Sequence, residues 1–196
     1  AFLLNRSSDL LAYHFNKEVL QWREQRPDII YIFSKDILRH RRAQKEDAVW
    51  LKKGEEYKDE TLSVRAFGST DVGVSFLLQA GGKKIFHAGD LNNWHWMDES
   101  TEAQWKGAEK NFLHELDDLY AYTPEVDVAM FPVDPRLGKE YMRGAGQFVT
   151  KIKTHIFVPM HFTPEYAKAN AFRDFAEAHG VRFVSLTHRG QKIEIE

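Results

Sequence analysis

A short apolar strand that stops at a Gly-Asp turn constrains this chain more than any other segment. Residues 84–96 read KIFHAGDLNNWHW, in which Ile85 and Phe86 form the apolar strand and Asp90 follows the turn. The carboxylate is therefore presented at a strand end, where a rigid scaffold can hold it. A strand-end carboxylate beside histidine and tryptophan side chains is typical of a metal-dependent hydrolytic site.

Strand-like and helix-like segments alternate along the whole chain. Strands are predicted at 1–4, 10–13, 29–33, 61–67, 74–80, 83–87, 126–133, 156–160, 181–186 and 192–196. Helices are predicted after Asn16, after Ser34, after Ser100 or Thr101, over 141–152 and over 164–179. No repeat or low-complexity tract divides the chain, so residues 1–196 are expected to form a single domain. The alternation predicts an α/β or α+β fold built in layers.

Composition narrows the function classes. The 196 residues are 43% hydrophobic and 13% aromatic, enough to bury a core. The net charge of −2 gives no reason to expect nucleic acid as a partner. The lack of cysteine excludes disulfides, thiolate metal sites and a cysteine nucleophile, and it fits the cytoplasmic location that we expect. No apolar run approaches the roughly 20 residues that cross a bilayer, so no membrane partner is expected.

Three predicted strands are each followed by a residue that can bind a metal. His14 follows the strand-like segment 10–13, Asp90 follows residues 83–87, and His161 follows the apolar segment 156–160. A single histidine at a strand end is more often structural than functional. Because α/β folds place their sites in loops after strands, the repeated context favours a shared site.

The same segments resemble a known family. HFN at 14–16, HAGDL at 87–91 and PMHF at 159–162 are similar, in order, to metal-binding motifs of the metallo-β-lactamase superfamily. FGSTDVGVSF at 67–76 and VDPR at 133–136 resemble a bacterial, uncharacterised branch of it. The resemblance covers nearly the whole chain and implies a four-layer αββα sandwich of metallo-β-lactamase type, with metal ligands on loops at one edge.

By this resemblance, His14, Asp90 and His161 are metal ligands, and Asp90 bridges two metals when both are present. The implied cofactor is zinc, as one or two ions, with manganese or iron as alternatives. The implied function is a metal-dependent hydrolase in which a metal-bound water attacks a small ester, lactone or phosphoester. The alternative is a degenerate, non-catalytic domain that binds or regulates a partner. Neither alternative specifies an oligomeric state.

The segment before His14 departs from the family pattern. The pattern has His, His and Asp where this chain has Asp9, Leu11 and Tyr13. Either the protein is a metal-poor member or a loop is missing between Asp9 and His14, together with the extreme N-terminus. The hairpin-like residues 1–13 favour the missing loop. The separate middle histidine of the family is also not evident at 65–71.

Six further residues are candidates for a substrate pocket or for support of the ligands: His87, Trp94, His95, Trp96, Asp134 and His188. His87 lies three residues before Asp90, so strand alternation points it to the opposite face and favours a supporting or core role. Asp134 follows a strand, which favours a role as acceptor to a metal-bound histidine over an exposed turn carboxylate. His188 also follows a predicted strand, so it is a further candidate at the sheet edge that carries the metal ligands.

A tryptophan-rich loop and a basic run each allow two interpretations. The Trp94-His95-Trp96 loop either walls a substrate pocket, with His95 as a donor or replacement ligand, or packs into the core. The basic run Arg39–Arg42 is either a phosphate-binding patch or a solvated face that suits the end of a helix. We favour the solvated face for the basic run.

Overall fold

The computed structural model describes residues 15–162 and 164–194. The strands predicted at 1–4 and 10–13, and His14, lie outside the described residues. Helical elements are η1 (Lys17–Glu24), α1 (Lys35–Arg39), η2 (Lys45–Asp47), α2 (Glu102–Tyr122), η3 (Pro135–Glu140), α3 (Arg143–Lys151), α4 (Tyr166–Asn170) and α5 (Arg173–Ala178). Strands are β1 (Ile32–Ser34), β2 (Val49–Leu51), β3 (Glu56–Lys58), β4 (Leu62–Phe67), β5 (Ser75–Ala80), β6 (Lys83–His87), β7 (Glu125–Pro132), β8 (Lys153–Met160) and β9 (Arg182–Phe183).

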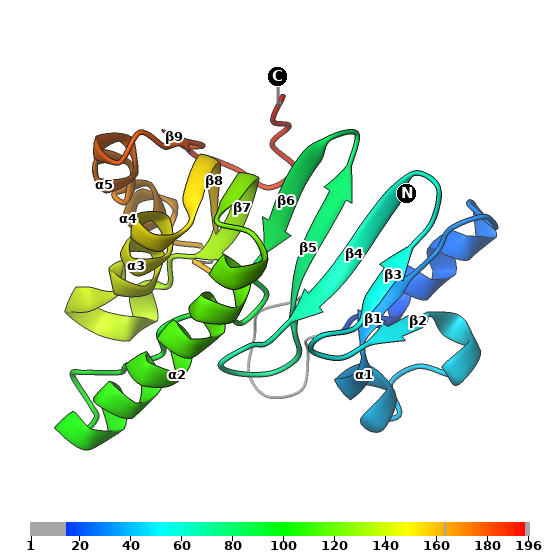
Figure 1. The fold of residues 1–196 in the computed structure, drawn as a ribbon, viewed down its shortest axis with the longest axis horizontal. Coiled ribbons are helices and arrows are strands. Elements are labelled where there is room, and N and C mark those ends of the chain that lie inside the picture. The colour runs from blue at the N-terminus through cyan, green and yellow to red at the C-terminus, as the bar shows by residue number, and fades with distance from the viewer. Residues whose placement is uncertain (1–14, 163, 195–196) are drawn as a thin grey trace.

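A mixed seven-stranded sheet forms the centre of the fold (Figure 1). Its strands follow the chain order from β3 to β9. Strands β3 to β6 pair antiparallel, whereas β6 to β9 pair parallel. The switch at β6 places the carboxyl ends of β6, β7 and β8 at one edge of the sheet. That edge is where the polar residues after these strands must gather.

One face of this sheet packs against helices α2, α3 and α5. Leu77 of β5, Phe131 of β7 and Phe157 of β8 join Phe112 and Leu116 of α2 in the largest buried cluster. Thr101 caps α2 and accepts a hydrogen bond from the Gln104 backbone N–H. The capped helix turns its apolar stripe to the sheet, as its 3.6-residue period predicts.

The other face of the sheet packs against the two-stranded β1–β2 sheet. Side chains alternate along the strands, so Phe76 faces Ile32 and Leu51 while its neighbour Leu77 faces the helices. On the far side of β1, Phe33 packs against Val19 of η1. The order of helices, seven-stranded sheet, two-stranded sheet and helices confirms the predicted layered α/β fold.

The predicted elements differ from the observed ones mainly at their ends. The helix capped by Asn16 is a 3-10 helix, and the helix predicted at 164–179 is divided into α4 and α5. Strands β2 and β3 were not predicted, because three residues are too few to set up an apolar alternation. Residues 192–194 form no strand. Within residues 15–162 and 164–194, no helix combines the length and apolar character needed to cross a lipid bilayer.

Candidate metal centre

The loop after β6 holds Asp90 in a fixed, buried position. Gly89 has a φ of +60°, and a Cβ there would lie 2.7 Å from the Val74 carbonyl oxygen, so only glycine fits this close approach. Asp90 is 1% exposed. Its backbone carbonyl accepts a hydrogen bond from Trp94 Nε1 at 2.8 Å. The Gly89 turn and the Trp94 hydrogen bond therefore fix the backbone that positions the Asp90 carboxylate.

Thr70 clamps the same loop from the β4–β5 connection. Its hydroxyl donates to the Asn92 carbonyl at 2.6 Å and accepts from the Asn92 N–H at 3.0 Å. The same oxygen lies 3.3 Å from the Asp90 carbonyl. Because one side chain satisfies both backbone groups of Asn92, it fixes the turn that follows Asp90.

His161 lies between two buried carboxylates. It follows β8 with a φ of +68°, and its side chain is 8% exposed. Nδ1 lies 2.8 Å from Asp134 Oδ2, and Nε2 lies 3.1 Å from Asp90 Oδ1. The three residues follow β8, β7 and β6, so the parallel register at the sheet edge brings them together.

Asp134 is held as an anion. Its carboxylate accepts from the Arg136 backbone N–H at 3.0 Å and from the Arg136 guanidinium at 2.6 Å. Burial alone would raise the pKa of Asp134, but hydrogen bonds from His161 and Arg136 outweigh it and lower the pKa to about 2. A carboxylate that stays ionised can keep accepting the proton of its histidine neighbour.

The contacts of Nδ1 favour one tautomer of His161. Its nearer neighbour is Asp134 Oδ2 at 2.8 Å, an acceptor only, whereas the Arg136 Nη2 donor lies 3.3 Å away, so we assign a proton to Nδ1. In the neutral ring, Nε2 is then an acceptor that faces a second acceptor, Asp90 Oδ1, at 3.1 Å. Two acceptors approach this closely only when a proton or a cation lies between them. The pair is therefore bridged either by a proton, carried by the imidazole or by the Asp90 carboxyl, or by a metal ion.

The donor atoms of Asp90 and His161 are spaced as two ligands of one metal ion would be. Ligand bonds of 2.0–2.1 Å in tetrahedral geometry place two donors about 3.3 Å apart, close to the observed separation of Nε2 and Oδ1. A carboxylate on the second nitrogen is the usual partner of a metal-binding histidine. Among the described residues, however, no group of three or more His, Cys, Asp or Glu side chains has the geometry to hold a metal. His161 and Asp90 thus fit as two ligands, and predicted ligand His14 lies outside the described residues.

The predicted pocket and supporting residues near Asp90 lie beside His161 or pack within the loop. Trp94 packs on His161 with ring centres 5.2 Å apart, and Trp96 stacks behind Trp94 at 6.4 Å. His95 is 1% exposed, with Nδ1 accepting from the Met97 N–H and Nε2 facing the Glu140 carbonyl, so both nitrogens are engaged in loop packing. The His87 ring Nδ1 accepts from the Gly89 N–H at 3.1 Å, and Gly89 directly precedes Asp90.

His188 does not join this group in the described residues. It is exposed, and its Nδ1 lies 2.9 Å from the Thr187 hydroxyl. In the described ranges, its ring contacts the neighbouring Thr187, whereas His161 contacts Asp90 and Asp134.

A second polar network ties the loop to the helices. Glu109 Oε1 of α2 accepts from Arg143 Nε at 2.7 Å, from Gln147 Nε2 at 2.6 Å and from Asn93 Nδ2 at 3.2 Å. The hydrogen bond from Arg143 lowers the pKa of Glu109, burial opposes it, and Gln147 adds to the lowering. A Cβ at Gly144 would lie 2.0 Å from Asn92 Oδ1, so α3 needs glycine there to approach the loop.

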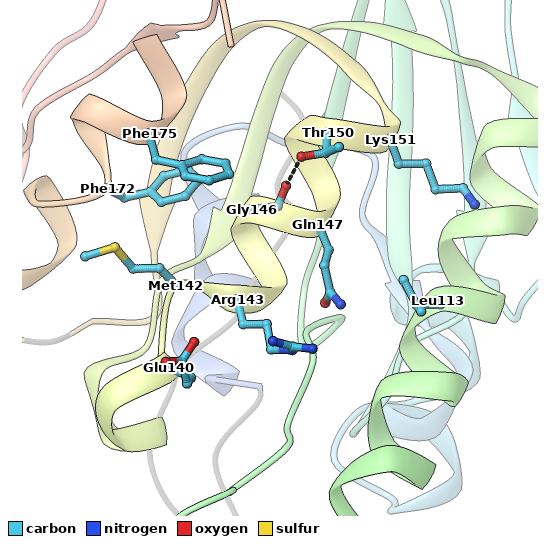
Figure 2. Close-up of a pocket in the computed structure, with 10 residues that line it drawn as sticks. All are labelled: Leu113, Glu140, Met142, Arg143, Gly146, Gln147, Thr150, Lys151, Phe172 and Phe175. Atoms are coloured by element: carbon cyan, nitrogen blue, oxygen red, sulfur yellow. Dashed lines mark hydrogen bonds between the residues drawn. The ribbon is translucent and has the colours of Figure 1, made fainter. Parts of the chain in front are cut away.

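A pocket of about 590 Å³ lies between α2, α3 and α5, and Arg143 and Gln147 of this network line it. Figure 2 shows Phe172 and Phe175 on one flank of α3 and Leu113 on the other, with Arg143 and Gln147 on the helix between them. Two residues that line it contact the loop after Asp90, namely Gln147 through Asn93 and Glu140 through His95. Neither Asp90 nor His161 lines this pocket, so it is separate from the candidate metal centre.

Sequence reasoning missed Thr70, Glu109 and Arg143. Thr70 and Asn92 lie 22 residues apart, and Asn93 and Gln147 lie 54 apart, so no local pattern pairs them. The only signal was indirect, because Thr70 lies in the segment where the family pattern would place a histidine.

The comparisons with known proteins support the fold. No protein-family model matches the chain, and no curated protein matches it. Among solved structures, the chain shares the metallo-β-lactamase fold.

Three of these structures illustrate the likeness. A protein assigned as a metal-dependent hydrolase from Parabacteroides distasonis is 15% identical with a TM-score of 0.63, over 93% of this chain and 74% of that one. The metallo hydrolase Igni18 from Ignicoccus hospitalis is 15% identical with a TM-score of 0.57, over 86% and 70%. Zinc-bound PqqB from Methylobacterium extorquens is 17% identical with a TM-score of 0.52, over 93% and 69%. At these identities the likeness shows the fold alone.

Proposed function

We propose that this protein is a metal-dependent hydrolase whose metal, zinc by preference, is held by Asp90 and His161. One observation carries the proposal: Asp90 Oδ1 and His161 Nε2 lie 3.1 Å apart, while the ionised Asp134 accepts a hydrogen bond from His161 Nδ1 at 2.8 Å. Similar structures are assigned as metal-dependent hydrolases, and PqqB holds zinc. On the resemblance, His14 is the proposed third ligand.

The residues of the chain divide the work in this proposal. Bound zinc lowers the pKa of water from 15.7 to about 7 and so supplies a nucleophile at neutral pH. Asp134 orients the His161 ring and keeps Nε2 free of a proton. Thr70 and Trp94 hold the backbone of the Asp90 loop. The half-buried Trp94 ring beside His161 offers an apolar wall to a small ester, lactone or phosphoester.

The alternative is a degenerate domain that does not catalyse hydrolysis. Two observations favour it: the described residues supply only two metal ligands, and the residues before His14 do not match the family's metal-binding motif. In that case Asp90, His161 and Asp134 form a buried proton-bridged triad that only stabilises the sheet edge.

Measuring the metal content of the protein expressed from the full-length gene distinguishes the hydrolase from the degenerate domain. The hydrolase proposal expects stoichiometric zinc, manganese or iron after purification, and a rise in melting temperature when metal is added to chelated protein. The absence of both effects would rule the proposal out. Hydrolysis is then assayed on matched carboxylic ester, lactone and phosphoester substrates.

Asp90→Ala provides the matched variant. It removes one proposed ligand, so metal content should fall and the metal-dependent rise in melting temperature should disappear. The control is Asp71→Ala, which removes an exposed carboxylate from the β4–β5 connection. If Asp90→Ala bound metal as well as the parent, Asp90 would not be a ligand.

A further inference from the structure

The basic run that follows α1 is divided by the structure. Arg39 ends α1 and is exposed, and His40 caps the helix. Arg41 adopts a left-handed backbone with a φ of +54°, which is unusual for a residue other than glycine. After this turn, Arg41 and Arg42 line a pocket of about 440 Å³, whereas Arg39 does not. The sequence run is therefore not one uniform solvated face.

The pocket combines three cations with an apolar base, and we call it the basic pocket. Lys17 of η1 joins Arg41 and Arg42, and the apolar contacts come from Leu20, Leu38 and Ala43. Gln44 and Asp47 complete the lining. The Asp47 carboxylate accepts from the Gln44 N–H at 2.6 Å, so part of its acceptor capacity is already used. The lining thus carries an excess of positive charge.

The cations of the basic pocket differ from their neighbours. Arg26 pairs with Asp28, Lys35 pairs with Glu55, and Arg23 donates to the Asp47 carbonyl. Within the described part of the chain, Lys17, Arg41 and Arg42 make no ion pair or side-chain hydrogen bond. Two guanidinium groups that line one pocket without an acceptor are suited to an oxyanion, which they can bind through charge-assisted hydrogen bonds.

We infer that the basic pocket binds a small organic phosphate. Its volume lies within the range of about 300–1,000 Å³ of small-molecule sites and exceeds what an inorganic phosphate would fill. Leu20, Leu38 and Ala43 give the rest of the ligand an apolar surface. The phosphate contacts Arg41, Arg42 and Lys17. This site shares no lining residue with the candidate metal centre, so it stands independently of the proposed hydrolase function.

The test is a calorimetric titration with phenyl phosphate, which joins one phosphate to one apolar ring. Because phosphate also binds metals, the titrations use chelated protein and are repeated in Asp90→Ala. We expect saturable binding in both, and affinity at least about tenfold lower in the double variant Arg41→Gln/Arg42→Gln. The matched control is Arg39→Gln/Lys45→Gln, which removes the same charge from residues outside the lining and should bind like the parent.

Folding is checked with Arg41→Gly. Glycine suits the left-handed backbone, so this variant should keep or raise the melting temperature while it loses phenyl phosphate affinity. Lack of saturable binding in the parent, or an equal loss in the matched control, would overturn the inference. So would equal affinity for inorganic phosphate, or binding to phosphatidylserine vesicles without binding to phenyl phosphate.

Discussion

The sheet edge and the basic pocket use charged side chains in opposite ways. At the sheet edge, Asp134 is buried and accepts hydrogen bonds from both His161 and Arg136. In the basic pocket, Arg41 and Arg42 have no ion-pair partner within the described residues. A charge that is fully paired fixes the geometry of its neighbours, whereas an unpaired, solvated charge remains available to a ligand. Stability and binding should therefore respond differently in the two regions.

The largest effect is expected from Asp134→Ala. The change leaves His161 Nδ1 without the Asp134 acceptor and removes one of the partners of Arg136, at a cost of about 2–3 kcal/mol in unfolding free energy. Metal affinity should fall about 10–100-fold, because the His161 ring is no longer oriented. Urea denaturation and metal titration measure the two effects. Asp134→Asn retains one acceptor and should lose less of both; equal losses would contradict the proposed role of Asp134.

Thr70→Val should cost less, about 1–2 kcal/mol. Valine keeps the shape but leaves the Asn92 N–H and carbonyl without the hydroxyl that contacts both. Thr70→Ser retains the hydroxyl and should recover most of the loss. Metal affinity should follow the same order, since Thr70 acts through the Asp90 loop. A Thr70→Val protein with parental stability and metal affinity would show that the clamp is dispensable.

Glu109→Gln tests a paired charge away from the metal centre. The pKa of Glu109 is lowered in the folded protein, so its ionisation contributes stability above the ordinary value near 4.5. This contribution is lost as the pH falls through the lowered folded-state pKa. The stability difference between the parent and Glu109→Gln, about 1 kcal/mol near pH 7, should therefore shrink in acid. A difference that stays constant from pH 7 to pH 3 would refute the ionic role.

The smallest effect is expected in the basic pocket. Arg42→Gln removes a cation that has no partner in the described residues, so the unfolding free energy should stay within about 0.5 kcal/mol of the parent. A loss comparable to that of Asp134→Ala would abolish the contrast between the two regions. Urea denaturation under the same conditions makes the comparison direct.

The sequence was sufficient for elements with a long apolar pattern and for the residues at their ends. The β4–β6 strands and α2 repeat buried residues at regular spacing, and Asp90 and His161 follow strands whose parallel pairing brings them together. It was insufficient for β2 and β3, which are too short for a period. The Thr70 clamp and the Glu109 network join distant segments, and their pairing depends on packing that local patterns do not encode.

Trp94 gives the candidate metal centre an optical reporter of its own. Its ring lies 5.2 Å from His161, and its indole N–H is bonded to the Asp90 backbone, so both proposed ligands adjoin one fluorophore. Any ion that changes the charge of the His161 ring should alter Trp94 emission. Comparing the parent with Trp94→Phe would isolate that signal from the other four tryptophans and follow occupancy in real time without a substrate.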